Sequence, residues 1–342
     1  MTRRIRLAAL AAVAAAVPAA LSGCAASNGA TSDQDQLSVV GFSVLKTANE
    51  PVISAFQKTG AGKGVTFTTS YGASGDQARA VIGGLHADEV HLSLEPDMTK
   101  LVDSGDVDKR WNQNATHGIL TDSVVVFLVR KGNPLGIKSW DDLVKPGVKV
   151  ITPNPESSGS AKWNILAAWA HAANAPGGND ANAQDFVTKL LRNTIAMPGS
   201  GSDALASFLA GNGDVLLAYE NDSIEARASG EDVDYVIPDD TLLIQNPAAV
   251  TTDASSKAKD FLDFQLSKQG QTLYAKAGFR PVVSGVTTDV PGVETPSDPF
   301  PEVKTLYTID KDFGGWSQAD PKYFDDKNGT ITKIISGLDI GS

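Results

Sequence analysis

Cysteine and histidine are scarce in this chain, and that scarcity excludes most metal chemistry. Cys24 is the only cysteine among 342 residues, so the chain can form neither an internal disulfide nor a thiolate cluster. The four histidines, His86, His91, His117 and His171, show no zinc-ligand spacing. We therefore expect no metal and no cofactor, and we expect His86 and His91 to lie at a strand edge or on the surface.

Motifs of nucleotide-binding proteins and hydrolases are also missing. The chain contains no P-loop and no glycine fingerprint for dinucleotides. The S-x-x-K pattern at Ser43 and the K-T-G pattern at Lys58 match two signatures of serine β-lactamases, but they lie far too close together for that family, and no S-D-N occurs. We conclude that these are chance matches, and we expect the chain not to be an enzyme.

The first 23 residues have the pattern of a secretion signal. Three arginines precede an Ala-, Val- and Leu-rich stretch, residues 7–21, which is too short and too weakly apolar to span a membrane. The sequence Leu-Ser-Gly-Cys that ends at Cys24 is similar to a bacterial lipobox, which implies cleavage before Cys24 and lipid attachment to its sulfur. An ordinary signal peptide with an incidental cysteine is the alternative. Residues 24–35 have the polar composition of a flexible tether.

Basic residues are outnumbered by acidic ones. The whole chain has a net charge of −11, and residues 1–23 hold three arginines and no acid. The remaining 319 residues therefore carry 26 Lys and Arg against 40 Asp and Glu, a net charge of −14. Such a chain repels nucleic acid, but a small anion is not excluded because exposed charges are screened within about 8 Å. The length suits two lobes rather than one core.

Short apolar runs alternate with helical patterns along most of the chain, which predicts an α/β fold. The predicted strands are residues 37–42, 65–69, 90–94, 123–129, 148–152, 215–219, 233–237 and 248–251. The predicted helices are residues 50–57, 76–85, 96–104, 161–172, 181–191, 203–210, 223–229 and 257–277. The last forty residues are turn-rich and then helical, and we expect them to pack on one lobe.

Three Ser/Gly loops each connect a predicted strand to a predicted helix. They contain Ser74 and Gly75, residues 158–160, and residues 199–202. A helix start leaves about four backbone N–H groups unpaired and carries roughly half a positive charge. Three converging starts would form an anion pocket without Lys or Arg. The alternative is that these residues only cap their helices, since Ser and Gly are favoured there.

Long segments around these loops resemble the periplasmic sulfate-binding proteins of sulfate/thiosulfate ABC importers. They are SYGASGDQARAVIGGLHADEV, SVVVFLVRKGNPLGIKSWDDLVKPGVKVITPNPESSGSAKWNILAAW and GDVLLAYEND. The resemblance runs from about residue 37 to residue 280. It implies a two-lobed type II solute-binding fold with a ligand cleft between lobes, formed by residues 36–117 with 243–342 and by residues 118–242. It also implies an extracytoplasmic, lipid-anchored monomer that binds sulfate and delivers it to the permease and ATPase of an ABC importer.

The resemblance also implies which residues hold the anion. The family's serine in the first loop falls on Ser74, and its Ser-Gly-Gly trio falls on Ser158, Gly159 and Ser160, with serine replacing the last glycine. That position contributes its backbone N–H in the family, so the change from glycine to serine does not harm anion binding if the φ angle there suits a serine. The small residue of the third loop falls on Gly201.

Two positions depart from the family pattern. The family's tryptophan, whose indole N–H points at sulfate, is Tyr219 here, and a phenol hydroxyl can donate instead. The family's Tyr-Asp-Pro-Thr near the start becomes Phe42-Ser43-Val44-Leu45, so an accessory polar contact is placed in doubt at Ser43.

The chemistry of these residues suits a fully ionised oxyanion. The side chains carried over offer donors and no carboxylate, and sulfate has no proton near neutral pH, whereas phosphate keeps one and needs an acceptor. Thiosulfate, molybdate and tungstate remain alternatives within the same class. An extracellular phosphate- or sulfate-ester hydrolase is the alternative from another class, but Ser158 has no neighbouring His and no S-x-x-K lysine.

Overall fold

The computed structural model describes residues 36–338, and the signal segment, the tether and Cys24 lie outside these residues. Its strands are β1 (Gln36–Phe42), β2 (Thr66–Gly72), β3 (Glu89–His91), β4 (Ile119–Arg130), β5 (Val150–Ile151), β6 (Thr194–Ala196), β7 (Val215–Tyr219), β8 (Val233–Val236), β9 (Asp240–Val250) and β10 (Thr305–Tyr307). Its helices up to β9 are α1 (Leu45–Phe56), α2 (Ser74–Ile82), α3 (Glu95–Ser104), α4 (Trp140–Leu143), α5 (Gly159–Asn174), α6 (Asp180–Arg192), α7 (Gly201–Leu209) and α8 (Glu220–Ala228). After β9 come α9 (Ser256–Leu266), α10 (Lys268–Lys276), α11 (Ile309–Phe313), α12 (Trp316–Phe324) and α13 (Thr330–Ser336).

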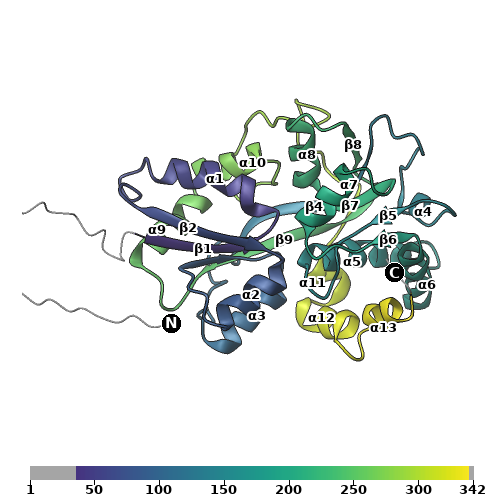
Figure 1. Ribbon diagram of the computed structural model, residues 1–342, viewed down its shortest axis with the longest axis horizontal. Coiled ribbons are helices and arrows are strands. Elements are labelled where there is room, and N and C mark those ends of the chain that lie inside the picture. The colour runs from purple at the N-terminus through teal and green to yellow at the C-terminus, as the bar shows by residue number, and fades with distance from the viewer. Residues whose placement is uncertain (1–35, 339–342) are drawn as a thin grey trace, which may run out of the picture. The chain divides into compact units, whose positions relative to one another are not determined.

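Eight of the ten described strands join into one path of hydrogen-bonded neighbours, in the order β2-β1-β3-β9-β4-β7-β5-β6. Off this path, β10 pairs with β9 and β8 pairs with β4. β1, β2 and β3 are parallel, as are β5, β6 and β7. Two long antiparallel strands, β4 and β9, connect these groups (Figure 1). The first half of β4 pairs with β9, and its second half pairs with β7 and β8. The polypeptide thus passes between the two groups along β4 and β9.

Alternate residues of β4 pack against different helices. Val125, Phe127 and Val129 belong to the same core cluster as the buried residues of α5 and α6. Val124, Val126 and Leu128 instead contact the buried residues of α7 and α8. Successive side chains of a strand point to opposite faces, so a strand covered on both faces is apolar throughout. This explains the unbroken apolar run in the middle of β4.

The β1-β2-β3 group is also covered by helices on both faces. Figure 1 shows α1 and α10 above these strands and α2 and α3 below them. Val39 packs in the core cluster that includes the buried residues of α1, whereas its neighbour Val40 packs with those of α2 and α3. Because helices cover both faces, the loops at the strand ends are free to form a site.

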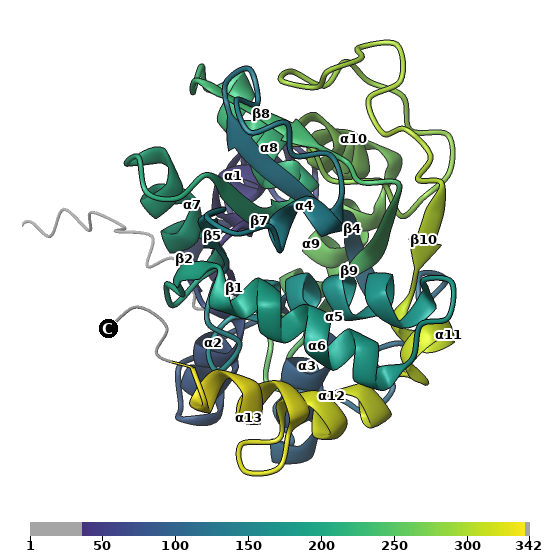
Figure 2. The same ribbon diagram turned by 90° about the vertical axis from the view of Figure 1, so that its right-hand side faces the viewer.

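The C-terminal helices contact elements from both groups. Figure 2 shows α12 and α13 running beside α5 and α6. Lys162 of α5 pairs with Asp320 of α12 at 2.6 Å, and Trp169 packs edge-on against Tyr323. α12 also contacts α3. The segment therefore packs against α3 as well as against α5 and α6, so the prediction that the last forty residues pack on one lobe was wrong.

The secondary structure agrees with most of the sequence-based predictions. Each of the eight predicted strands overlaps a strand of the structure, and the α/β class is confirmed. The predicted helix 257–277 is instead two helices, because Ser267 ends α9 and caps α10 by accepting the N–H of Gly270. The placement of His91 was wrong, since it is fully buried in β3 between two neighbouring strands.

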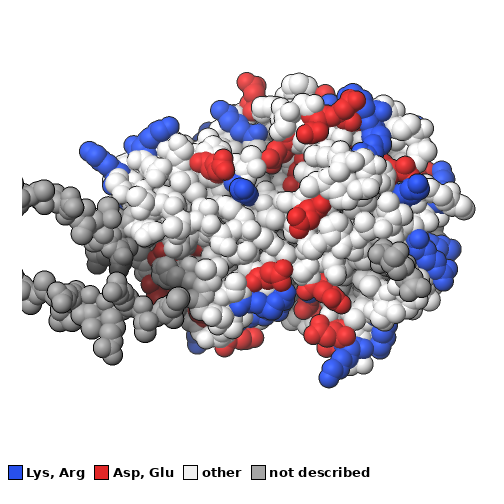
Figure 3. All heavy atoms as spheres, in the orientation of Figure 1, with Lys and Arg blue, Asp and Glu red and all other residues white. Residues whose placement is uncertain are grey.

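Charged side chains of both signs are scattered over the face shown in Figure 3, with uncharged surface between them. Among residues 36–338, no helix combines the length and the apolarity needed to cross a bilayer. Within the same range, no group of three or more His, Cys, Asp or Glu side chains could hold a metal ion.

Candidate functional site

Two of the predicted Ser/Gly loops begin buried helices that have no side-chain cap. α2 starts at Ser74 after Ala73, and α5 starts after Ser158, yet neither helix start receives a hydrogen bond from its N-cap side chain. Ser74 and Ser158 are both buried. The N–H of Gly75 donates to the carbonyl oxygen of Ser157 at 3.1 Å, so the two loops touch. Buried helix starts without caps have N–H groups available for a ligand.

The third loop lies against the second. α7 begins at Gly201, and a Cβ atom at Gly201 would lie 3.0 Å from Ser160 Oγ. Ser200 caps this helix by accepting the N–H of Asp203. The preceding N–H, that of Ser202, donates to Ser43 Oγ at 3.4 Å. The structure thus brings Ser43, Ser160 and Gly201 together.

Tyr219 lies at the end of β7 and is the N-cap residue of α8. It is fully buried, and its hydroxyl lies 2.7 Å from Ser93 Oγ and accepts a long hydrogen bond from Asn246 Nδ2 at 3.4 Å. Burial raises the pKa of Tyr219 above its ordinary value, and hydrogen bonds with Ser93, Asn246 and Ser160 offset only part of that rise. The phenol therefore keeps its proton and can donate it.

Ser74 occupies the predicted place, but its hydroxyl proton is already used. Ser74 Oγ donates to Asp97 Oδ2 at 2.7 Å and accepts the N–H of Ser93 at 2.9 Å. The other oxygen of Asp97 accepts from Lys100 Nζ at 2.9 Å. In this conformation Ser74 can offer a ligand its backbone N–H but not its hydroxyl.

Gly159 is required by a close approach between distant parts of the chain. A Cβ atom at Gly159 would lie 2.4 Å from Ser93 Oγ and 2.6 Å from Ser93 Cβ. Its neighbour Ser160 replaces a family glycine. Ser160 lies in the first turn of α5 with an ordinary negative φ, so a side chain is tolerated there.

Reasoning from the sequence missed three buried residues that contact the predicted ones, namely Ser93 just after β3, Asp97 in α3 and Asn246 in β9. Trp163, which the sequence predicts in the first turns of the helix opened by residues 158–160 and close to the anion or the lobe interface, lies in the second turn of α5. The carbonyl oxygen of Ser93 accepts from Trp163 Nε1 at 3.0 Å and from Asn246 Nδ2 at 2.8 Å. One signal was present, because Ser93 also lies between a predicted strand and a helix start.

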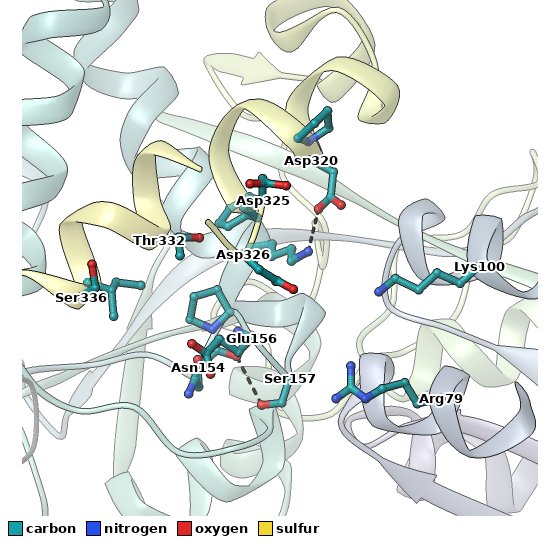
Figure 4. Close-up of a pocket in the computed structure, with 15 residues that line it drawn as sticks. Arg79, Lys100, Asn154, Glu156, Ser157, Asp320, Asp325, Asp326, Thr332 and Ser336 are labelled. Atoms are coloured by element: carbon teal, nitrogen blue, oxygen red, sulfur yellow. Dashed lines mark hydrogen bonds and ion pairs between the residues drawn. The ribbon is translucent and has the colours of Figure 1, made fainter. Parts of the chain in front are cut away.

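Two cavities lie near the predicted residues. One of about 320 Å³ is lined by Ser43, Lys46 and residues of the first and third loops. A larger one, of about 1030 Å³, is lined in part by Ser157. Figure 4 shows Arg79 and Lys100 on one wall of this larger cavity, facing acidic residues such as Asp326. It contains none of the predicted ligand residues, and its opposed charges do not resemble an anion site.

Comparison with known proteins decides the family. The family model described as bacterial extracellular solute-binding protein matches residues 37–280. The chain belongs to this family. The α/β architecture described above is accordingly the fold of solute-binding proteins, as the sequence predicted.

Named relatives narrow the comparison further. The chain is 37% identical over 331 residues to a sulfate-binding protein of Synechococcus elongatus, covering 92% of each chain. It is 32% identical to a thiosulfate-binding protein of Pseudomonas aeruginosa, covering 84% of this chain and 87% of that protein. Among solved structures, the sulfate-binding protein SubI from Mycobacterium tuberculosis is 45% identical, with a TM-score of 0.80 over 85% of this chain and 99% of SubI. The predicted relationship to sulfate-binding proteins is confirmed.

Proposed function

We propose that this protein binds sulfate outside the cytoplasm and delivers it to an ABC importer. The observation that carries the proposal is the pair of buried helix starts at Ser74 and Ser158, neither of which has a side-chain cap. Ser93 bonds both Ser74 and the buried hydroxyl of Tyr219. The names of the relatives, most of them sulfate-binding proteins, support sulfate as the ligand.

The donors proposed for sulfate come from three helix starts and from Tyr219. We assign hydroxyl donors to Ser158 and Tyr219, and backbone N–H donors to the first turns of α2, α5 and α7, including Gly159, Ser160 and Gly201. Hydrogen bonds to a charged acceptor contribute about 1.5–3 kcal/mol each, and each helix end adds ~0.3–1 kcal/mol. About seven such bonds offset the large cost of removing a dianion from water.

Two predicted residues take smaller roles in this proposal. The hydroxyl of Ser74 holds Asp97, so Ser74 contributes its N–H. Ser43 Oγ accepts the N–H of Ser202 and keeps its own proton for the anion or for water. We place Ser43 at the rim, since it is the one predicted ligand residue that lines the 320 Å³ cavity.

The two predicted lobes, residues 36–117 with 243–342 and residues 118–242, are part of the proposal. The change of partner along β4 supports a crossing there, because Ile119–Val124 pairs with β9 whereas Val125–Val129 pairs with β7. The proposed ligand residues lie on both sides of that crossing. Ser43 and Ser74 precede β4, and the others follow it.

Isothermal titration of the purified domain with sulfate, thiosulfate, molybdate and tungstate tests the ligand. We expect sulfate to bind most tightly, with thiosulfate as the nearest competitor. Tight binding of molybdate with no heat from sulfate would transfer the assignment to molybdate. The ester-hydrolase alternative predicts release of product from an aryl sulfate or aryl phosphate, and we expect none.

Membrane attachment is proposed through Cys24, which lies outside the described residues. The lipobox-like sequence before Cys24 and the extracellular character of the family support this proposal. Cys24→Ser is expected to release the protein into the medium or to leave an uncleaved precursor, with unchanged sulfate affinity of the soluble domain. A fully processed, membrane-bound Cys24→Ser variant contradicts the anchor.

We also propose that the protein is a monomer that docks on the importer's permease and ATPase complex.

A further inference from the structure

Ser93 connects the proposed donor groups to one another. It lies just after β3 and is almost fully buried. Its N–H donates to Ser74 Oγ at 2.9 Å, and its carbonyl oxygen accepts from Trp163 and Asn246. Its hydroxyl oxygen lies 2.7 Å from the hydroxyl of Tyr219. Every polar group of Ser93 is therefore engaged with a residue at or beside the proposed site.

The number of protons decides the direction of the Ser93–Tyr219 hydrogen bond. A phenol has one proton to donate and an oxygen that can accept. If Tyr219 donated to Ser93, the phenol proton would not be available for a hydrogen bond to a ligand. The hydroxyl of Ser93 has no other hydrogen-bond partner among residues 36–338, so its proton would then have no acceptor in a buried place. The opposite direction leaves no donor unpaired once an anion is bound.

We propose that Ser93 donates its hydroxyl proton to Tyr219 and thereby orients the phenol proton toward the bound oxyanion. Ser93 is thus a positioning residue for anion binding and touches the ligand only through Tyr219. This inference rests on the proposed function, because it requires Tyr219 to face an oxyanion. Asn246 Nδ2, 3.4 Å from the same phenol oxygen, donates in the same sense.

Burial makes this orientation consequential. The raised pKa of Tyr219 keeps the phenol neutral, so its single proton serves either Ser93 or the anion. The neighbouring hydroxyl of Ser160 also competes for that proton. A donor from Ser93 into the phenol oxygen favours the rotamer in which the proton faces away from Ser93.

A double-mutant cycle measured by isothermal titration with sodium sulfate tests the proposal. The variants are Ser93→Ala, Tyr219→Phe and the two combined, at pH 7 and constant ionic strength. We expect Ser93→Ala to raise the Kd for sulfate about tenfold and Tyr219→Phe about 10- to 100-fold. We expect the double variant to bind within about twofold of Tyr219→Phe alone, because Ser93 acts through the phenol hydroxyl.

If Ser93→Ala lowered the sulfate affinity equally in the parent and in the Tyr219→Phe variant, the proposal would be overturned. A purely structural role of Ser93 acts whether or not the phenol hydroxyl is present. An unchanged Kd for Ser93→Ala in the parent would also overturn the proposal. Ser223→Ala is the matched control. It removes a buried hydroxyl that bonds the carbonyl oxygen of Tyr219, not its phenol, and should leave the Kd within about twofold.

Two further measures keep the test decisive. If Ser93→Ala fails to fold, as judged by circular dichroism, the cycle is run with Ser93→Cys, which keeps a side-chain atom at this position and is a weaker donor. If the parent binds no sulfate but binds molybdate or thiosulfate, the choice of sulfate has failed. The cycle is then measured with that anion, and the same coupling between Ser93 and Tyr219 is expected.

Discussion

Trp163 on α5 donates its indole N–H to the carbonyl oxygen of Ser93, 3.0 Å away. Ser93 follows β3, on the other side of the β4 crossing. The same indole is buried and packs edge-on against Trp316, with ring centres 4.9 Å apart. Trp163 therefore joins the two groups of strands at the point where the proposed ligand residues meet.

We expect micromolar sulfate to change the intrinsic fluorescence of the domain as the proposed lobes close on the anion. Closure would bury the indole of Trp163 and form its bond to Ser93, and both change its environment. Trp163→Phe should remove most of the response, whereas Trp111→Phe, which changes a partly buried tryptophan away from the proposed ligand residues, should keep it. A full response from the Trp163→Phe variant would show that Trp163 does not report ligand binding.

Gly159→Ala tests whether the contact between Gly159 and Ser93 belongs to the ligand-bound form. The added Cβ would overlap Ser93 Oγ and Cβ, and overpacking of this kind costs ~1–3 kcal/mol. If the lobes separate when the site is empty, that cost falls on the closed form alone. We expect sulfate affinity to fall about tenfold or more, with little change in the melting temperature without sulfate.

Gly199→Ala is the matched control for this prediction. A Cβ at Gly199 would meet no atom closer than Ser157 Oγ at 4.0 Å, so binding and stability should both be retained. A Gly159→Ala variant that loses stability without sulfate but keeps its affinity would mean that the contact with Ser93 persists in the empty protein.

Much of the fold could be predicted because the strands are buried on both faces. Runs such as the one in β4 have no polar residue to interrupt them, and turn residues separate them from the helices. β6 and β10 were not predicted, whereas β3 and β5, which are no longer, were found because each lies within a longer apolar run. The break between α9 and α10 was missed because the amphipathic pattern continues across Ser267.

The candidate site was predictable only in part. Each Ser/Gly loop could be recognised locally because a helix start follows it directly in the sequence. The contact between Ser93 and Tyr219 joins residues 126 positions apart, and no local spacing records it. The hydrogen bond from Ser74 to Asp97 was missed for the same reason, and it changes which group of Ser74 a ligand can reach.

The burial of Glu89 predicts a pH-dependent stability. It lies in β3, fully buried, and neither carboxyl oxygen has a hydrogen-bond partner among residues 36–338. Burial raises the pKa of Glu89 to about 8, and a weak interaction with Gln265 offsets only part of the rise. Between pH ~4.5 and 8 the folded state holds a proton that the unfolded state has released, so the free energy of unfolding falls as pH rises through this window.

We expect Glu89→Gln to flatten that dependence. At pH 7 the loss in the parent amounts to roughly 3 kcal/mol relative to pH 4.5, and the neutral amide avoids it. Urea unfolding at pH 5, 7 and 8 measures the difference, with the exposed Glu302→Gln as the control. Parallel pH profiles for the parent and Glu89→Gln would mean that Glu89 does not titrate in this window.

We expect the proposed site to select against phosphate because its assigned ligand groups include no free carboxylate. The carboxylate of Asp97 bonds one proposed ligand residue, Ser74, but its two oxygens already accept hydrogen bonds from Ser74 and Lys100. Protonated phosphate would leave a buried O–H unpaired at ~1–3 kcal/mol or more, and polar sites of this kind can discriminate by about 10⁴-fold. We expect titration calorimetry to show weak phosphate binding, least weak at high pH, where phosphate loses its proton.

Sulfate affinity should change little from pH 5 to 8. Sulfate does not titrate in this range, Tyr219 keeps its proton, and burial lowers the pKa of His91 to about 3, so that ring stays neutral.

Two variants of Ser158 distinguish the effect of charge from the effect of a lost hydrogen-bond donor on sulfate binding. Ser158→Ala removes one donor and should weaken sulfate binding by about 1.5–3 kcal/mol. Ser158→Asp places a carboxylate at the buried start of α5, where it repels the dianion and occupies the free N–H groups, so sulfate binding should be abolished. Comparable affinities of the parent for phosphate and sulfate at pH 6 would mean that an acceptor faces the ligand. In that case Asp97 must release Ser74 or Lys100 on binding, and the donor-only mechanism is wrong.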